Sequence, residues 1–114
     1  MKKINPAIGV KHDEGKPAME LLPPDAIEGA ATVFAYGKRK YSAWNWRNGL
    51  QTSRLLGATL RHIFAWSAGQ DLDLESGLPH LDHALCSLMM LRSTAASGEA
   101  HLDDRWKPKK RNAK

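Results

Sequence analysis

The chain has 114 residues, a length that suits one small domain. Hydrophobic residues make up 42% of it and charged residues 25%, which is ordinary for a soluble protein. No segment approaches the roughly 20 apolar residues that a membrane-spanning helix needs, and the first residues lack the apolar run of a signal peptide. A single cysteine excludes an internal disulfide framework and fits a reducing compartment. We therefore expect a cytoplasmic protein.

The net charge of +5 is concentrated at one end of the chain. The last ten residues, RWKPKKRNAK, carry six Lys and Arg and no acid, which leaves residues 1–104 with a net charge of about −1. The basic character therefore belongs to a tail, residues 105–114, and not to the body of the domain. Such a tail can contact nucleic acid or simply form a flexible, solvated end. Contact with nucleic acid is expected only through this tail.

The first half of the chain predicts one helix between two irregular segments. Residues 1–23 are expected to form an irregular lead-in, because proline and glycine recur in them. The first helix is predicted to begin at Pro24, since proline suits the first turn, and to end at Gly37 and the basic cluster that follows it. Residues 40–53, KYSAWNWRNGLQTS, have no helical period and predict a loop with a turn at Asn48–Gly49.

The second half predicts two more helices. The second is expected to begin at a Thr52 or Ser53 cap and to close at Gly69. An acidic connector, QDLDLESGLP, precedes a third helix from about Pro79 to Ala96. This third helix is apolar around most of its surface, which indicates burial on most sides. The sequence therefore predicts an all-α domain over residues 1–104, a small bundle of three main helices completed by oligomerisation.

Histidines and acids are expected to meet where the second helix ends and the third begins. His80 and His83 lie one turn apart on one face of the third helix, and His62 lies late in the second. In an antiparallel pair joined by a short connector, these positions are neighbours. Glu28 of the first helix and three connector acids lie near these elements in the chain, and histidine with carboxylate can hold a divalent metal; the connector acids are Asp71, Asp73 and Glu75. Asp82 is expected to face away from the histidines, at the surface.

The residues alone leave simpler interpretations open. A histidine on an apolar helix can be a hydrogen-bonded core residue, and acids before a helix can simply favour its N-terminus. The aromatic residues of the loop, Tyr41, Trp44 and Trp46, can stack on a nucleobase or close the open end of a small bundle.

The order of several motifs resembles a known family. These motifs are GKP at 15–17, LLP at 21–23 with Glu28 after it, GxxKYxxxNW at 37–46 and LRHxxAWxxGxDxDxESGxxHxxHA at 60–84. Together they are similar to the phage and prophage family of dATP/dGTP diphosphohydrolases, which itself resembles the MazG-like all-α nucleoside triphosphate pyrophosphohydrolases. The resemblance covers residues 11 to about 92.

The resemblance implies an enzyme that hydrolyses a (deoxy)nucleoside triphosphate, with dGTP or dATP expected, to the monophosphate and pyrophosphate. It also implies dependence on Mg²⁺ or Mn²⁺, a homodimer or homotetramer, and action in the host cytoplasm if a phage encodes the chain. MazG-like enzymes place carboxylates where this chain has histidines. Imidazole suits Mn²⁺, Co²⁺ or Zn²⁺ better than Mg²⁺, so Co²⁺ and Zn²⁺ are possible metals as well. Gly29 also stands where members often have a second acid.

Under this hypothesis, individual residues receive roles. Glu28 and Glu75 are the expected catalytic residues. The expected metal ligands are Glu28, His62, Asp73, Glu75, His80 and His83. The residues expected to bind the substrate are Lys16, Arg39, Lys40, Tyr41, Asn45 and Trp46.

Two other hypotheses compete with the enzyme. The chain can be a non-enzymatic helical module that binds nucleic acid or nucleotides and whose histidine cluster is structural. It can also be a degenerate family member that binds nucleotides without hydrolysing them, an alternative that Gly29 and the basic tail permit.

Overall fold

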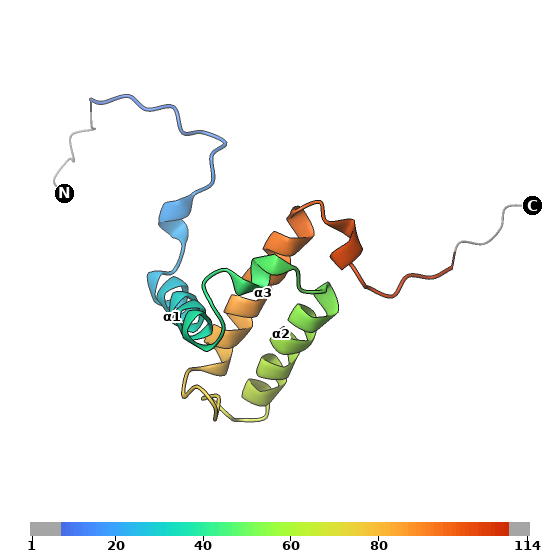
Figure 1. Ribbon diagram of the computed structural model, residues 1–114. Coiled ribbons are helices and arrows are strands. Elements are labelled where there is room, and N and C mark those ends of the chain that lie inside the picture. Colours follow the sequence, from blue (N-terminus) through green and yellow to red (C-terminus); the bar gives the residue numbers. More distant parts are fainter. Residues whose placement is uncertain (1–7, 110–114) are drawn as a thin grey trace, which may run out of the picture.

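The computed structural model describes residues 8–109, which form helices and connecting segments (Figure 1). Within this range the only β-type pairing is an isolated antiparallel bridge between Leu72 and Pro79, so the all-α prediction is confirmed. No helix in the described range combines the length and the apolar character needed to cross a membrane. The α-helices are α1 (Pro24–Lys40), α2 (Thr52–Ser67) and α3 (His80–Ala96), and the 3-10 helices are η1 (Met19–Leu21), η2 (Asn45–Asn48) and η3 (Ala100–Leu102).

The helix pair α2 and α3 forms the centre of the molecule, and α1 packs across α3 (Figure 1). The buried apolar residues come from all three helices, but none of the large side chains in the described range is completely enclosed. The core of the single chain is therefore thin, as expected at this length. Its apolar members are Ala30, Val33, Leu55, Ala84 and Cys86.

Helix α1 lies close to α3 at Gly29. The carboxylate of Asp82 occupies the space that a Cβ atom on Gly29 would need. Asp82 is half-buried there, so the expectation that it lies at the surface was wrong. The physical reason is that α1 crosses the first turn of α3 and covers the side that faces away from the histidines.

Helices α1 and α2 both end where the sequence predicted. Helix α1 ends at Lys40, the last residue of the predicted basic cluster, and the three basic residues in its last turn suit the helix dipole. Helix α2 closes as predicted at Gly69, whose φ of +97° is the left-handed conformation that glycine adopts without strain. The Gly69 N–H donates to the Trp66 carbonyl at 2.9 Å and the Gln70 N–H to the Ala65 carbonyl at 3.0 Å, a Schellman motif.

The N-terminus of α2 is capped by a residue from the far end of the chain. The Asp104 carboxylate accepts hydrogen bonds from the Thr52 hydroxyl at 3.0 Å, from the Ser53 N–H at 2.8 Å and from the Ser53 hydroxyl. The prediction that Thr52 or Ser53 itself caps the helix was therefore wrong, because both residues lie inside the first turn and donate their hydroxyls to Asp104, whose negative charge suits a helix N-terminus. These hydrogen bonds hold the pKa of Asp104 below its usual range.

Helices α2 and α3 leave many large apolar side chains partly exposed. Phe64 is 66% exposed and Met89 is 44% exposed, although α3 was expected to be buried on most sides. The single chain therefore leaves apolar area uncovered on both helices. The exposed apolar residues of this pair are Leu56, Leu60, Ile63, Phe64, Trp66, Leu81, Leu85, Leu88 and Met89.

The contact between Gly29 and Asp82 yields a stability prediction with a control in the same helix. The substitution Gly29→Ala forces Asp82 or α1 to move, and we expect it to destabilise the fold by about 1–3 kcal/mol relative to Gly37→Ala. A Cβ on Gly37 meets nothing within 4 Å, so Gly37→Ala should stabilise the helix by about 0.5–1 kcal/mol. Urea unfolding of the two variants measures the difference.

The double variant Gly29→Ala/Asp82→Ala tests whether the clash with Asp82 causes the destabilisation. It should recover most of the stability lost in Gly29→Ala, because the space taken by the carboxylate becomes available. Equal stabilities for Gly29→Ala and Gly37→Ala would contradict the close approach.

Candidate functional site

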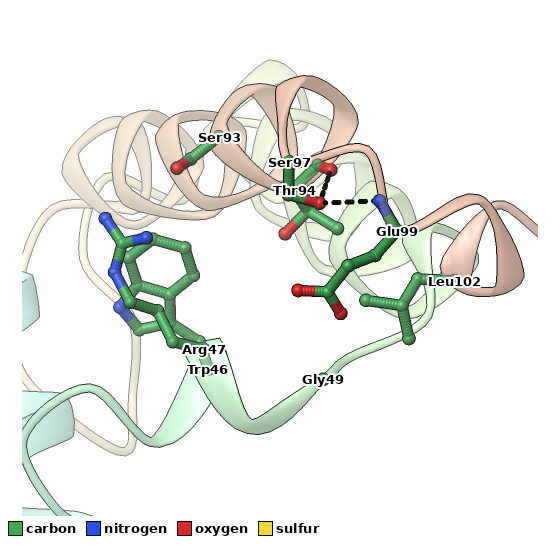
Figure 2. A pocket seen from close by; sticks show the side chains of 8 residues that line it. All are labelled: Trp46, Arg47, Gly49, Ser93, Thr94, Ser97, Glu99 and Leu102. Carbon is green, nitrogen blue, oxygen red and sulfur yellow. Dashed lines mark hydrogen bonds between the residues drawn. The ribbon is translucent and has the colours of Figure 1, made fainter.

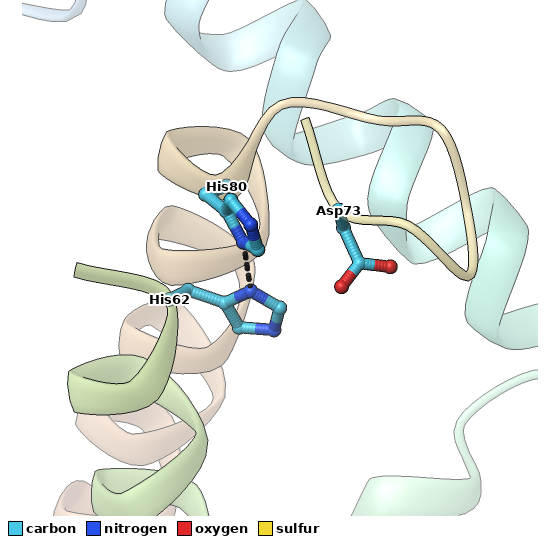
Figure 3. A group of neighbouring side chains, drawn as sticks. All are labelled: His62, Asp73 and His80. Carbon is cyan, nitrogen blue, oxygen red and sulfur yellow. Dashed lines mark hydrogen bonds between the residues drawn. The ribbon is translucent and has the colours of Figure 1, made fainter. Parts of the chain in front are cut away.

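Three residues from separate elements converge at the junction of α2 and α3 (Figure 3). His62 lies on α2, His80 is the first residue of α3, and Asp73 comes from the connector between them. One ligand atom from each lies within 4.8 Å of the other two. The antiparallel packing of α2 and α3 thus brings together the residues that the sequence predicted to be neighbours.

The two histidines of this group are joined by a hydrogen bond. Nδ1 of His62 and Nδ1 of His80 are 2.8 Å apart, so one proton lies between them. On its other side, Nε2 of His80 is 2.7 Å from the Gln70 side-chain oxygen. His80 is only 5% exposed, and its backbone N–H donates to the Asp71 carbonyl at 2.9 Å. The His80 ring is therefore held at both of its nitrogens, and the backbone of His80 is held by Asp71.

His83 lies against the same group but has a different partner. Its ring stacks on that of His62, with centroids 4.4 Å apart and planes 11° from parallel. Its Nε2 is 2.6 Å from the Ser76 hydroxyl oxygen and 3.9 Å from Oδ2 of Asp73. Burial lowers the pKa of His62 and that of His83, and the neighbouring imidazoles add to this effect at both.

The connector is folded back on itself around Asp73. The Asp73 N–H donates to the Leu78 carbonyl and the Gly77 N–H to the Asp73 carbonyl, both at 2.8 Å. The Ser76 N–H donates to Oδ2 of Asp73 at 2.9 Å. Burial alone would raise the pKa of Asp73, but the hydrogen bonds from Ser76 and the nearby histidines hold it below its usual range. Asp73 is therefore an ionised, fixed carboxylate facing the histidines.

Glu75 points from the connector towards α1 instead of towards the histidine group. Its Oε1 accepts hydrogen bonds from Nζ of Lys40 at 2.5 Å and from the Tyr36 hydroxyl at 3.1 Å. These bonds lower the pKa of Glu75 and raise that of Lys40, whereas burial is the main cause of the raised pKa of Tyr36. Two residues with separately predicted roles, Glu75 and Lys40, are thus paired with each other.

The remaining predicted residues lie apart from the histidine group. Glu28 is exposed on α1 and does not belong to the group, and Lys16 and Arg39 are also exposed. Tyr41 is 64% exposed, with its ring centroid 5.4 Å from Nζ of Lys40. Asn45 begins η2 and is half-buried. The roles predicted for these residues stay predictions.

Trp46 lies at the opposite end of α3 from the histidines. It lines a pocket of about 50 Å³ together with Arg47 and residues of the last turn of α3 (Figure 2). The Arg47 guanidinium lies 4.4 Å from the Trp46 ring centroid and 5.0 Å from that of Trp44. Trp44 has a φ of +64°, a strained conformation for a bulky side chain. Both interpretations of the aromatic loop, base stacking and closure of the bundle, fit this arrangement.

Three residues at the site had no predicted role. Gln70, Ser76 and Tyr36 bond respectively to His80, His83 and Glu75. Ser76 lies within the ESG part of the longest motif, which was a usable signal. No sequence signal marks Gln70 or Tyr36, because their hydrogen-bond partners are defined only once the helices pack.

The basic tail is described as far as residue 109. Arg105 and Lys107 both pair with Asp103, with nitrogen–oxygen distances of 2.8 and 3.5 Å. Part of the charge predicted to be available for nucleic acid is therefore neutralised within the chain. Residues 110–114 lie outside the described range, and so do residues 1–7 of the lead-in.

Comparison with known proteins identifies the family to which the chain belongs. The family described as dATP/dGTP diphosphohydrolase, N-terminal, matches residues 6–105. A curated protein of Salmonella phage PMBT28, described as a dATP/dGTP diphosphohydrolase, is 38% identical over 98 residues. The match covers 86% of this chain and 33% of that protein, so the chain spans about a third of its length. No solved structure matches the chain.

The lowered pKa values predict how the stability of the metal-free protein depends on pH. The folded pKa values of His62 and His83 lie below the ordinary value of 6.5, so the unfolded chain binds more protons. Their contribution to stability is full above pH 6.5 and is lost as the pH falls through 6.5 towards the folded pKa values. Urea unfolding in the presence of a chelator, from about pH 7.5 to pH 5, should show this decline.

A matched pair of variants assigns the decline to the site. His83→Gln should flatten it, whereas His101→Gln should leave it unchanged because the His101 side chain is 74% exposed. A pH dependence that is the same in both variants would assign the decline elsewhere.

Proposed function

Because the chain belongs to the family of dATP/dGTP diphosphohydrolase N-terminal domains, we propose that it is a metal-dependent hydrolase of deoxynucleoside triphosphates. The products are the nucleoside monophosphate and pyrophosphate, and dGTP and dATP are the first substrates to test. The observation that carries the proposal is the convergence of His62, Asp73 and His80 at the junction of α2 and α3. Deoxynucleoside triphosphates are made in the cytoplasm, and there we expect the protein to act, in the host cytoplasm if a phage encodes it.

The donor set suits a divalent transition metal. Ligands about 2.1 Å from one ion lie roughly 3–4 Å from one another, and the three ligand atoms here are within 4.8 Å of one another without an ion. Two imidazoles and one carboxylate favour Mn²⁺, Co²⁺ or Zn²⁺ over Mg²⁺, which prefers oxygen. Such an ion supplies positive charge for the triphosphate and lowers the pKa of water. His83, stacked on His62, is the nearest further ligand.

The reaction requires water to attack the α-phosphorus while the bond from that phosphorus to the bridging oxygen breaks. The electron pair of that bond leaves with pyrophosphate, and the water gives up a proton. Asp73, ionised and fixed by Ser76, serves as a ligand. Glu75 and Glu28 are the proposed proton acceptors, and Glu75 gains basicity when Lys40 turns from it to a phosphate oxygen.

Other residues of the proposal bind the substrate. Lys16 and Arg39 are exposed cations that can reach phosphate oxygens. Tyr41 and Asn45 are proposed to contact the base and sugar, because the loop that carries them begins beside Lys40. Trp46 lies at the other end of α3, about 20 Å along the helix from His80, and is not assigned to the same nucleotide in one chain.

A homodimer or homotetramer is part of the same proposal. The exposed apolar residues of α2 and α3 leave a surface that water disfavours. A second copy of the chain would cover it and thicken the core.

An assay of pyrophosphate release tests the activity. With Mn²⁺, Co²⁺ or Mg²⁺ we expect the chain to hydrolyse dATP or dGTP. His80→Ala should reduce the rate by more than about 100-fold, because it removes a proposed ligand. His101→Ala should retain the activity, since His101 lies on η3, away from the group. Absence of hydrolysis of every nucleotide with every metal, from a chain that circular dichroism shows to be helical, would refute the proposal.

Sedimentation velocity tests the assembly. The chain should sediment as a dimer or a larger species, and Phe64→Glu should shift it towards the monomer by placing a charge in the covered surface. Leu74→Glu is the control, because Leu74 is 89% exposed but lies in the connector. A wild-type chain that stays monomeric at all concentrations would remove oligomerisation from the proposal.

A further inference from the structure

Gln70 is placed beside His80 by the way α2 ends. Its backbone N–H donates to the Ala65 carbonyl in the Schellman motif, and Gly69 before it holds the left-handed conformation that this motif requires. The backbone position from which the Gln70 side chain extends is therefore fixed. From there its amide oxygen reaches Nε2 of His80 at 2.7 Å, across the junction of the two helices.

This hydrogen bond determines where the proton of His80 lies. An amide oxygen only accepts, so Nε2 of His80 must donate to it. A neutral imidazole has one ring proton, which leaves Nδ1 of His80 with a lone pair. That lone pair faces Nδ1 of His62 at 2.8 Å, on the side where Asp73 completes the group.

We propose that Gln70 is a positioning residue: its amide oxygen holds the proton of His80 on Nε2 and thereby keeps Nδ1 available as a ligand for a divalent cation. The inference rests on the metal site proposed above. Histidine ligands of metals usually donate their second ring N–H to an oxygen acceptor, which fixes both the tautomer and the ring orientation. Gln70 is the residue that provides this acceptor to His80.

An amide differs from a carboxylate in one respect that makes the proposal testable. If the Gln70 amide turned over, its NH₂ group would donate to Nε2, and the His80 proton would move to Nδ1 and block the lone pair. A carboxylate at position 70 has no such second state. Gln70→Glu should therefore hold the same tautomer as the wild type, whereas Gln70→Leu keeps the size of the side chain and removes the acceptor.

The first measurement uses the metal-free protein. Long-range proton–nitrogen NMR spectra of the imidazole rings distinguish the Nε2–H from the Nδ1–H tautomer. We expect Nε2–H for His80 in the wild type and in Gln70→Glu, and a mixture or Nδ1–H in Gln70→Leu. An Nδ1–H tautomer in the wild type would overturn the proposal, and so would an unchanged tautomer in Gln70→Leu.

The second measurement is the affinity for Mn²⁺ and Co²⁺ by calorimetry. Gln70→Leu should weaken binding by about 10–100-fold, the usual effect of losing such a partner, and Gln70→Glu should bind at least as tightly as the wild type. Ser67→Ala is the control, an exposed residue at the same helix end. Because Gln70 is exposed, both variants should fold, which urea unfolding verifies.

The outcomes separate this inference from the function on which it rests. A wild-type chain that binds neither ion refutes the metal site itself, whatever the tautomer of His80. A wild-type chain that binds the ion, together with Gln70→Leu of equal affinity, refutes only the positioning role of Gln70.

Discussion

The tight reversal of the chain between α2 and α3 is the constraint on which the other features depend. Gly69 stops α2 in a left-handed conformation, and the hydrogen bond from the His80 N–H to the Asp71 carbonyl begins α3 within the same short connector. With both helix ends fixed, His62 and His80 have to face each other. The folded connector then positions Asp73 beside these two histidines.

Much of this arrangement was readable from local signals. Three helices follow from apolar periodicity, and the end of α2 follows from Gly69, because these features depend on residues close in the chain. The meeting of His62 with His80 was also predictable, since a short connector between antiparallel helices leaves one geometry. The family resemblance rested on the spacing of the motifs, and the matched family confirms that resemblance.

The features that the sequence did not predict all depend on contacts between distant segments. Asp104 caps a helix whose first residue is Thr52, and Asp82 fills the space above Gly29. Neither pairing has a signature in spacing, because it arises from how helices cross. The same holds for Glu75: its sequence neighbours suggest a ligand, but the end of α1 supplies Lys40 and turns the carboxylate away from the histidines.

The cap formed by Asp104 also sets the direction in which the chain leaves the helices. The N-terminus of α2 lies at the end of the α2–α3 pair opposite the connector and its histidines (Figure 1). The chain past Asp104 therefore starts from the end of the helix pair that is remote from the candidate site. Purification tags, fluorescent reporters or surface linkers attached there should leave nucleotides free access to the histidines. Attachment within the connector would place the same additions directly over them.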